Sequence, residues 1–95
     1  MTLKTFDDVK RAITVGTELD MIYYRPTWMP TPNLPMHRKV LFVQSNGIAM
    51  TAWPGHAGPS WLHWGKSSEC RIDGPDTFSI IDTTAGEVIA TYRIV

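Results

Sequence analysis

Three neighbouring residues of this 95-residue chain have side chains that commonly bind zinc, namely His56, His63 and Cys70. Six residues separate each consecutive pair. This spacing matches none of the usual zinc patterns, and a fourth ligand is not evident. Cys70 also falls at an inward position of a predicted strand, where a thiol behaves as a small hydrophobic group. We therefore predict no metal site and no cofactor.

Other groups that could catalyse a reaction have simpler explanations. A cysteine nucleophile must be an exposed thiolate within reach of a histidine, and the inward position of Cys70 argues against that. Asp73 and Asp76 flank a Gly-Pro pair and are typical of a turn. Asp7 and Asp8 suit the start of a helix. Phosphate-binding loops and nucleophile elbows are absent from the sequence. We predict that the protein is not an enzyme; a small hydrolase-like enzyme without a recognisable motif is one alternative.

The aromatic residues give the strongest indication of function. Four tryptophans lie in or beside two loops rich in proline and glycine, residues 26–37 and 54–60. Tryptophan and tyrosine are enriched in protein interfaces and ligand pockets. If both loops meet at one rim of the fold, opposite Asn46-Gly47, their side chains can hold a planar or anionic group or a partner's side chain. The alternative is that the tryptophans plug one end of the core. The predicted site consists of Trp28, Trp53, Trp61, Trp64, His56, His63, Tyr24 and Arg25.

A short helix is predicted over residues 5–15. Thr5 is a suitable N-cap, and acidic residues follow in the first turn, where the helix dipole favours them. Gly16 is a natural residue to end the helix. A helix of about three turns is marginally stable alone, so it must pack against the rest of the protein. Its apolar face, at helical spacing, consists of Phe6, Val9, Ala12 and Ile13.

A hairpin is predicted at Asn46-Gly47, which separates two apolar runs. Both residues tolerate positive φ and suit a two-residue turn. In that register Val43 pairs with Met50, and Leu41 lies on the same apolar face. This hairpin is the central element around which we arrange the other strands.

The remaining strands are predicted from alternation of apolar and polar residues between turn signals. Residues 61–64 form either a short strand or one helical turn. As a strand, this segment places Trp61 and His63 on one face and Leu62 and Trp64 on the other. The predicted strands cover residues 18–25, 38–45, 48–53, 68–73, 77–82 and 87–94.

These elements make one domain over residues 1–95, of the mainly β (α+β) class. Short antiparallel strands expose their edges, and closure into a barrel removes those edges. We therefore predict a small, strongly bent antiparallel β-barrel, SH3-like, with five to six strands and one N-terminal helix. A helix packed on an open sheet is the alternative.

Charge and composition argue against several classes of protein. Nine basic residues balance nine acidic ones, so the chain has no net field that attracts nucleic acid. A nucleic-acid-binding small barrel stays an alternative, because Arg25, Arg38 and Lys39 bracket a loop and could form a basic patch. No apolar run approaches the roughly 20 residues of a membrane span. Cys70 has no second cysteine with which to form a disulfide. We predict a cytoplasmic protein without membrane contact.

Three fragments of the sequence resemble small uncharacterised accessory proteins of phages that infect actinobacteria. They are Arg38-Lys-Val-Leu-Phe-Val-Gln-Ser-Asn, Trp61-Leu-His-Trp-Gly-Lys-Ser-Ser-Glu and Thr91-Tyr-Arg. The resemblance carries no motif of known chemistry and implies a protein, such as an inhibitor, that acts on a host component. We therefore predict a small non-enzymatic binding protein that binds a host protein or sequesters a small nucleotide-like ligand through its tryptophan-rich loops. A homo-oligomer is compatible with this interpretation.

Overall fold

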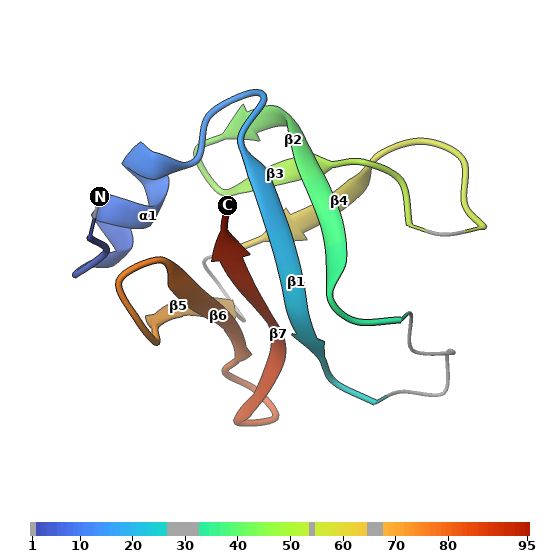
Figure 1. The fold of residues 1–95 in the computed structure, drawn as a ribbon. Helices are drawn as coiled ribbons and strands as arrows, with labels where there is room; N and C mark the ends of the chain where they lie inside the picture. Colours follow the sequence, from blue (N-terminus) through green and yellow to red (C-terminus); the bar gives the residue numbers. More distant parts are fainter. Residues whose placement is uncertain (1, 27–32, 54, 65–67) are drawn as a thin grey trace.

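The structure is a computed structural model that describes residues 2–26, 33–53, 55–64 and 68–95. Within these ranges the chain forms one helix and seven strands (Figure 1). Residues 61–63, which we predicted as part of either a short strand or a helical turn, belong to a strand, and this strand adds to the predicted five to six. The elements are α1 (Phe6–Ala12), β1 (Glu18–Tyr24), β2 (Met36–Gln44), β3 (Gly47–Met50), β4 (Ser60–His63), β5 (Ser68–Ile72), β6 (Thr77–Asp82) and β7 (Glu87–Ile94).

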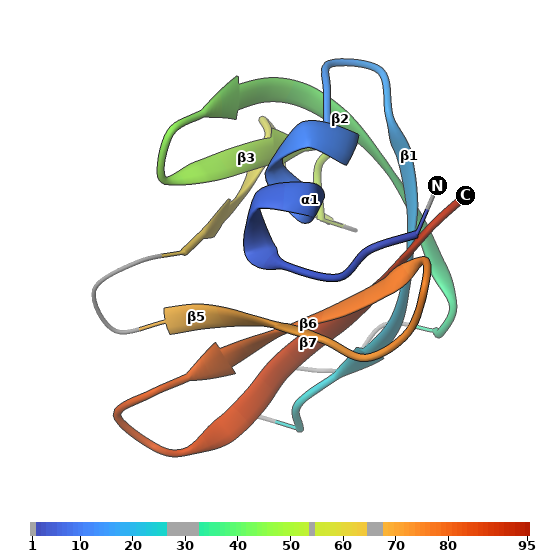
Figure 2. The same cartoon turned by 90° about the vertical axis from the view of Figure 1, so that its left-hand side faces the viewer.

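The seven strands form one antiparallel sheet in the order β4-β3-β2-β1-β7-β6-β5. In the described part of the chain β4 and β5 are not paired with each other, so the predicted closure into a barrel is wrong. The bent sheet instead curves around α1, with β2 and β3 on one side of the helix and β5 and β6 on the other (Figure 2). Phe6 of α1 packs edge-on against Trp64, which follows β4, and α1 also contacts β5. The helix therefore fills the space between the two sheet edges, and the alternative of a helix on an open sheet describes the fold.

The start of α1 follows the prediction closely. Thr5 is the N-cap: its hydroxyl accepts a hydrogen bond from the Asp8 N–H at 3.3 Å, and the Asp8 carboxylate accepts one from the Thr5 N–H at 3.1 Å. Val9 and Ile13 are fully buried on the predicted apolar face. The helix ends at Ala12, because the next residue already has extended backbone angles. Gly16, with a φ of +93°, lies in the turn before β1 and does not end the helix.

The turn between β2 and β3 is shifted by one residue from the prediction. Gln44 pairs with Gly47, so the two turn residues are Ser45 and Asn46. Gly47 lies in β3, is buried, and does not have a positive φ. A Cβ atom at this position would lie 2.4 Å from the carbonyl oxygen of Leu62 in β4. The glycine is therefore required by the close approach of β4 and not by the geometry of the turn.

A bulge in β2 changes which of its side chains face the core. The register shifts between Val40 and Phe42, so that Val40, not Val43, pairs with Met50. Val40 is 1% exposed, whereas Phe42 is 57% exposed. Leu41, which we predicted on the inner apolar face, is only partly buried and lies outside the core cluster. A bulge adds one residue to a strand and thereby reverses the alternation beyond it.

A second bulge lies in β1 and concerns the predicted site. The register with β7 shifts between Met21 and Tyr23, and Tyr24 then pairs with Ala90. Strict alternation would put Tyr24 and Met21 on opposite faces, but the extra residue turns Tyr24 toward the core, against which it packs. Tyr23 is left 41% exposed. The end of β1 therefore presents an aromatic ring to the interior of the bent sheet.

The core lies between the concave face of the sheet and α1. Strands β6 and β7 supply much of it, since Phe78, Ile80, Ala90 and Tyr92 are all buried. Tyr92 stacks on Phe78 with ring centroids 5.7 Å apart. The buried cluster consists of Leu3, Val9, Ile13, Leu19, Met21, Val40, Ile48, Met50, Leu62, Trp64, Phe78, Ile80, Ala90 and Tyr92.

Candidate ligand-binding site

A cavity of about 260 Å³ opens where β1 and β3 end and β2 and β4 begin. The antiparallel register brings these chain segments together, because Met50 pairs with Ser60 and Tyr24 pairs with Ala90. We call the cavity the aromatic pocket. Its described lining consists of Tyr24, Arg38, Met50, Trp53, His56, Ser60, Trp61, Leu62, Ile89, Ala90 and Tyr92.

Arg38 is the most unusual residue of this lining, because it is charged and 1% exposed. Its Nη2 donates a hydrogen bond to the carbonyl oxygen of Thr51 at 2.6 Å. Its Nε and Nη1 atoms have no hydrogen-bond partner within the described ranges. Burial lowers the pKa of the guanidinium from its ordinary value, but arginine keeps its charge in proteins. The wall of the pocket therefore contains a buried positive charge, and two of its nitrogen atoms can still donate hydrogen bonds.

Two aromatic side chains lie beside this charge. The guanidinium carbon of Arg38 lies 5.4 Å from the centre of the Trp53 ring, within the range of a cation–π contact. Tyr24 meets Trp53 with ring centroids 5.0 Å apart and planes tilted by 55°.

Burial raises the pKa of Tyr92 to about 12, although Arg38 has the opposite effect on that pKa. Tyr92 is therefore a neutral phenol at neutral pH.

Four of the predicted site residues line the aromatic pocket: Tyr24, Trp53, His56 and Trp61. They come from the end of β1, the segment after β3 and the start of β4. A backbone hydrogen bond from the His56 N–H to the Trp53 carbonyl, at 2.9 Å, closes a turn beside the pocket. The predicted meeting of aromatic residues at the end of the fold opposite the β2–β3 turn thus holds for these four.

Trp64 and His63 lie at the other end of the fold, and for them the predicted placement is wrong. β4 runs antiparallel to β3, so His63 pairs with Gly47, and the Trp64 N–H donates to the Asn46 carbonyl at 3.0 Å. Both residues therefore lie beside the turn that we expected to be opposite. Trp64 is 5% exposed and belongs to the core. His63 is exposed and stacks on Trp61 with ring centroids 6.0 Å apart.

Arg25 does not take part in the pocket, because two carboxylates hold its guanidinium. Its Nη1 lies 3.1 Å from Asp82 and 2.8 Å from Glu87, at the far end of the β6–β7 hairpin. The predicted basic patch is therefore not assembled: Arg25 is paired, Arg38 is buried, and only Lys39 is exposed. Trp28, the eighth predicted site residue, lies outside the described residues.

Sequence reasoning missed Arg38, Met50 and Tyr92 as parts of the site. Met50 and Tyr92 looked like ordinary core residues, and they are buried. Arg38 could have been identified from the sequence. It lies two residues before Val40 in β2, so its charged side chain is on the same, buried face of the strand. A charged residue at an inward position is rare unless it is paired, and this pattern could have identified it.

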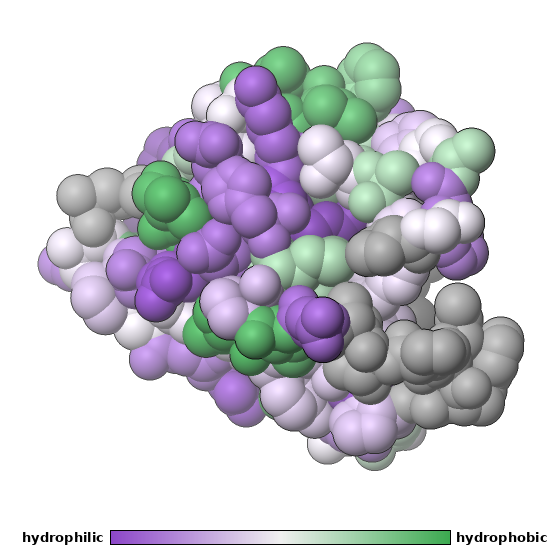
Figure 3. Space-filling model, turned by 45° about the vertical axis from the view of Figure 1, so that its right-hand side comes forward, coloured by the Kyte–Doolittle hydropathy of each residue, from purple (hydrophilic) through white to green (hydrophobic). Residues whose placement is uncertain are grey.

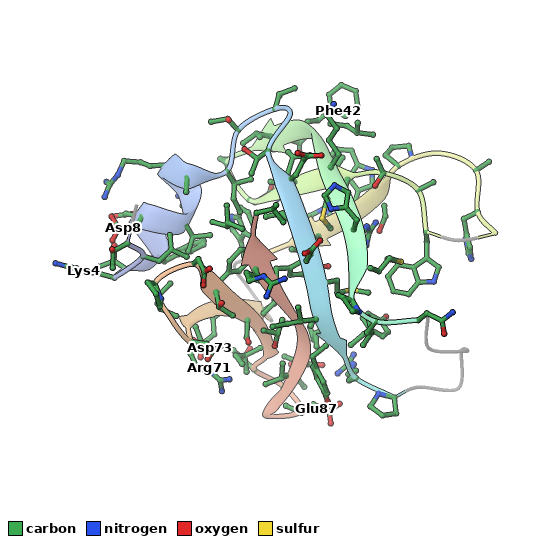
Figure 4. All side chains as sticks on the ribbon, in the orientation of Figure 1. Lys4, Asp8, Phe42, Arg71, Asp73 and Glu87 are labelled. Atoms are coloured by element: carbon green, nitrogen blue, oxygen red, sulfur yellow. The ribbon has the colours of Figure 1, made fainter. Side chains whose placement is uncertain are left out.

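Two other groups with catalytic potential, around Ser79 and at Cys70, are not part of the pocket lining. The Ser79 hydroxyl donates to Asp73, which also accepts from Arg71 at 2.7 Å; Figure 4 shows Arg71 and Asp73 next to each other at the lower edge of the sheet. Ser79 is fully buried, so no substrate reaches its hydroxyl. Burial raises the pKa of the Cys70 thiol to about 12, which leaves it protonated at neutral pH.

None of the known proteins compared with this chain matches it, and the described residues contain neither a candidate metal site nor a helix that could span a membrane. Comparison of the chain with protein-family models, curated proteins and solved structures found no match. Among the described residues no group of three or more His, Cys, Asp or Glu side chains could hold a metal ion. In the same ranges no helix has the length and apolar character needed to cross a membrane.

Proposed function

We propose that this protein is a non-enzymatic binding protein that takes a small ligand into the aromatic pocket. The observation that supports this most strongly is the convergence of Tyr24, Trp53 and Trp61 on one cavity with Arg38, whose Nε and Nη1 have no hydrogen-bond partner within the described ranges. Ligand sites are typically concave, largely apolar and supplied with a few polar groups that fix orientation. The aromatic pocket has each of these properties.

The resemblance to phage accessory proteins extends this proposal to the biological setting. It rests on three sequence fragments and implies that the ligand is a host molecule that the protein sequesters. A nucleotide-like ligand was our expectation from the sequence, because aromatic rings stack on bases and arginine binds phosphate.

The proposal is tested by what the protein retains when it is purified from host cells. We expect denaturation to release a small molecule, close to one per chain, that mass spectrometry can identify. Ser60 is partly buried and lines the pocket, so a Ser60→Trp variant should fill the cavity and release much less. Thr83→Trp, at an exposed turn position, is the matched control and should retain the molecule. Equal retention by the two variants contradicts the proposed site.

A second candidate function is contact with a host protein, and an outer surface that shares Trp61 with the pocket favours it. Phe42, Ala49 and Trp61 pair in one row across β2, β3 and β4. Phe42 is 57% and Trp61 44% exposed on the outer face, while Ala49 between them is buried. Apolar side chains gather at the top of the molecule in Figure 3, the end at which Figure 4 places Phe42. Exposed aromatic residues of this kind are common anchors in interfaces.

The two candidates predict opposite behaviour of two variants. Phe42→Ala lies outside the pocket lining, so it should weaken capture of a host protein without changing ligand retention. Ser60→Trp should do the reverse. Co-purification of the two variants and the unmodified protein from host lysate, analysed for proteins and for small molecules, distinguishes them.

Nucleic-acid binding by an SH3-like fold is the weakest of the three candidates. The similarity of this fold to SH3 domains stays a prediction. Arg25 is neutralised by acidic partners, and Arg38 is buried, so two of the three expected phosphate contacts are occupied or covered. Binding of single-stranded DNA that weakens steeply with salt is the result that would favour this candidate.

A further inference from the structure

Arg38 indicates which class of ligand the aromatic pocket takes. We infer that the ligand is a small planar monoanion, an aromatic carboxylate, whose carboxylate group pairs with the Arg38 guanidinium while its ring lies against Trp53 and Tyr24. This inference rests on the proposed function and adds the chemistry of the ligand to it.

The first argument concerns charge. Removing an ion from water is unfavourable unless a partner of opposite charge or a full set of hydrogen bonds compensates. Arg38 donates to the Thr51 carbonyl and interacts with the hydroxyl of Tyr92, but both partners are neutral, and no acidic residue belongs to the described pocket lining. Because arginine does not release its proton, the protein cannot remove the charge by titration. A ligand carboxylate supplies the missing negative charge and accepts hydrogen bonds from Nε or Nη1.

The second argument concerns shape. Trp53 and Tyr24 meet at 5.0 Å and form an aromatic wall next to the guanidinium. The deeper lining is apolar, with Met50, Leu62 and Ala90 each at most 8% exposed. Aromatic rings favour offset stacking and edge contacts with other rings, and an apolar floor excludes a strongly hydrated ligand. A flat and largely apolar body therefore fits better than a sugar or a polyol.

The third argument concerns size and the amount of charge. Arg38 is the only lysine or arginine in the described lining and therefore its only permanently charged side chain, which favours a ligand with one negative charge. A phosphate ester at neutral pH carries between one and two. The cavity volume of about 260 Å³ also lies just below the roughly 300–1,000 Å³ of pockets for drug-sized ligands. These quantities favour a compact aromatic acid over the nucleotide-like ligand that the sequence suggested.

Trp53 is the side chain that must move when the ligand binds. Arg38 is almost fully covered, so contact with Nε or Nη1 requires a displaced neighbour. Trp53 lies over the guanidinium, is partly exposed, and belongs to a segment outside the strands. Because Trp53 takes part in no strand pairing, its ring can move away from Arg38 while the sheet stays intact. Ligand binding should therefore change the signal of the Trp53 indole.

The experiment measures binding of two acids and their neutral amides by titration calorimetry at neutral pH. The probes are benzoate and indole-3-acetate, with benzamide and indole-3-acetamide as isosteres that lack the charge. We expect each acid to bind roughly ten- to hundredfold more tightly than its amide, because the acid alone forms charge-assisted hydrogen bonds with Arg38. Adenosine monophosphate is titrated in parallel and should bind more weakly than indole-3-acetate.

Two variants test whether Arg38 is the group responsible. Arg38→Met keeps a long side chain without charge and should reduce the affinity for the acid to that of the amide. Lys39→Met is the matched control, since Lys39 is the exposed neighbour on β2 and its loss changes the net charge equally. It should leave affinity unchanged. If Arg38→Met does not fold, the comparison of acid and amide on the unmodified protein still decides.

The outcomes separate this inference from the proposed function. Equal affinity for acid and amide contradicts the anionic ligand but leaves a small-ligand pocket in place. Tighter binding of adenosine monophosphate overturns the monocarboxylate in favour of a nucleotide. If neither acids, amides nor the nucleotide bind and nothing is retained on purification, the inference and the proposed function both fail.

Discussion

Gly47 shows how a single residue can be required for a reason that the local sequence does not reveal. The Asn-Gly pair suggested a turn with positive φ, but Gly47 is a buried residue of β3 whose missing Cβ makes room for the Leu62 carbonyl. We predict that Gly47→Ala lowers the free energy of unfolding by about 1–3 kcal/mol, because the added methyl group forces β3 and β4 apart.

The control for this substitution is Gly74→Ala. The nearest atom to a Cβ at Gly74 would be the Thr77 Cβ at 3.7 Å, an ordinary contact, so the change should cost less than about 0.5 kcal/mol. Chemical denaturation of both variants measures the difference. An unchanged midpoint for Gly47→Ala would mean that β4 does not approach β3 as closely as described.

His37 makes stability depend on pH. Its Nδ1 lies 3.0 Å from Asp20, and its Nε2 lies 3.0 Å from Glu18. Both hydrogen bonds raise the pKa of the imidazole above 6.5, and the bond to Asp20 has the larger effect. Arg93 also contacts Asp20, at 3.1 Å. A raised pKa in the folded state means that the protonated imidazole stabilises the fold.

The stabilisation by His37 is fully present below pH 6.5 and is lost as the pH rises through the raised pKa. We predict that His37→Gln lowers the melting temperature at pH 5.5 and has a smaller effect at pH 8.5. Thermal unfolding of both proteins over that range provides the measurement. A difference that stays constant with pH would contradict the raised pKa of the imidazole in the folded protein.

At the scale of elements, the side chains of β4 and of Trp64 directly after it alternate between the core and the outer face of the sheet. Leu62 and Trp64 face the core, whereas Trp61 and His63 face outward, as the alternation predicted. We predict that Trp64→Ala lowers the free energy of unfolding by about 3–5 kcal/mol, since it removes the ring on which Phe6 packs. Trp61→Ala is the matched control, and it should cost much less because its side chain is 44% exposed.

A third variant, Trp64→Phe, tests the contribution of the indole nitrogen separately from that of the ring. Nε1 is buried without a hydrogen-bond partner in the described part of the chain. Trp64→Phe therefore removes a polar group that contributes nothing to stability and should be tolerated far better than Trp64→Ala. Denaturation curves for the three variants give the ranking. Equal losses for Trp61→Ala and Trp64→Ala would contradict the two-sided arrangement of β4.

The predictable elements are those in which local pattern and tertiary structure agree. The N-cap at Thr5 follows from its residue type, and the buried face of α1 follows from helical periodicity. The register of β2 and the orientation of Tyr24 do not, because each depends on a bulge that adds one residue to a strand. The close contact of Gly47 with Leu62 depends on a third strand, which no local pattern of the hairpin indicates.

At the scale of the whole molecule, four of the predicted site residues lie together at one end of the sheet, whereas His63 and Trp64 lie at the other end. Strand β4 returns along β3, and this carries His63 and Trp64 away from the loop end where Trp53 and His56 remain. The course of the chain after the central hairpin was therefore the missing information. The same course leaves the sheet open between β4 and β5, with α1 in the gap, where a barrel was expected.

The most direct test of the aromatic pocket observes the Arg38 guanidinium itself during a titration with indole-3-acetate. In isotope-labelled protein, the arginine Nε–H and tryptophan indole N–H signals report on each side chain separately by magnetic resonance. We predict a progressive downfield shift of the Arg38 Nε–H signal, as it gains a charge-assisted hydrogen bond, and a shift of the Trp53 indole signal. The Arg25 signal should stay unchanged, because Asp82 and Glu87 already hold its guanidinium. An unchanged Arg38 signal at saturation, or equal shifts with indole-3-acetamide, would contradict the account.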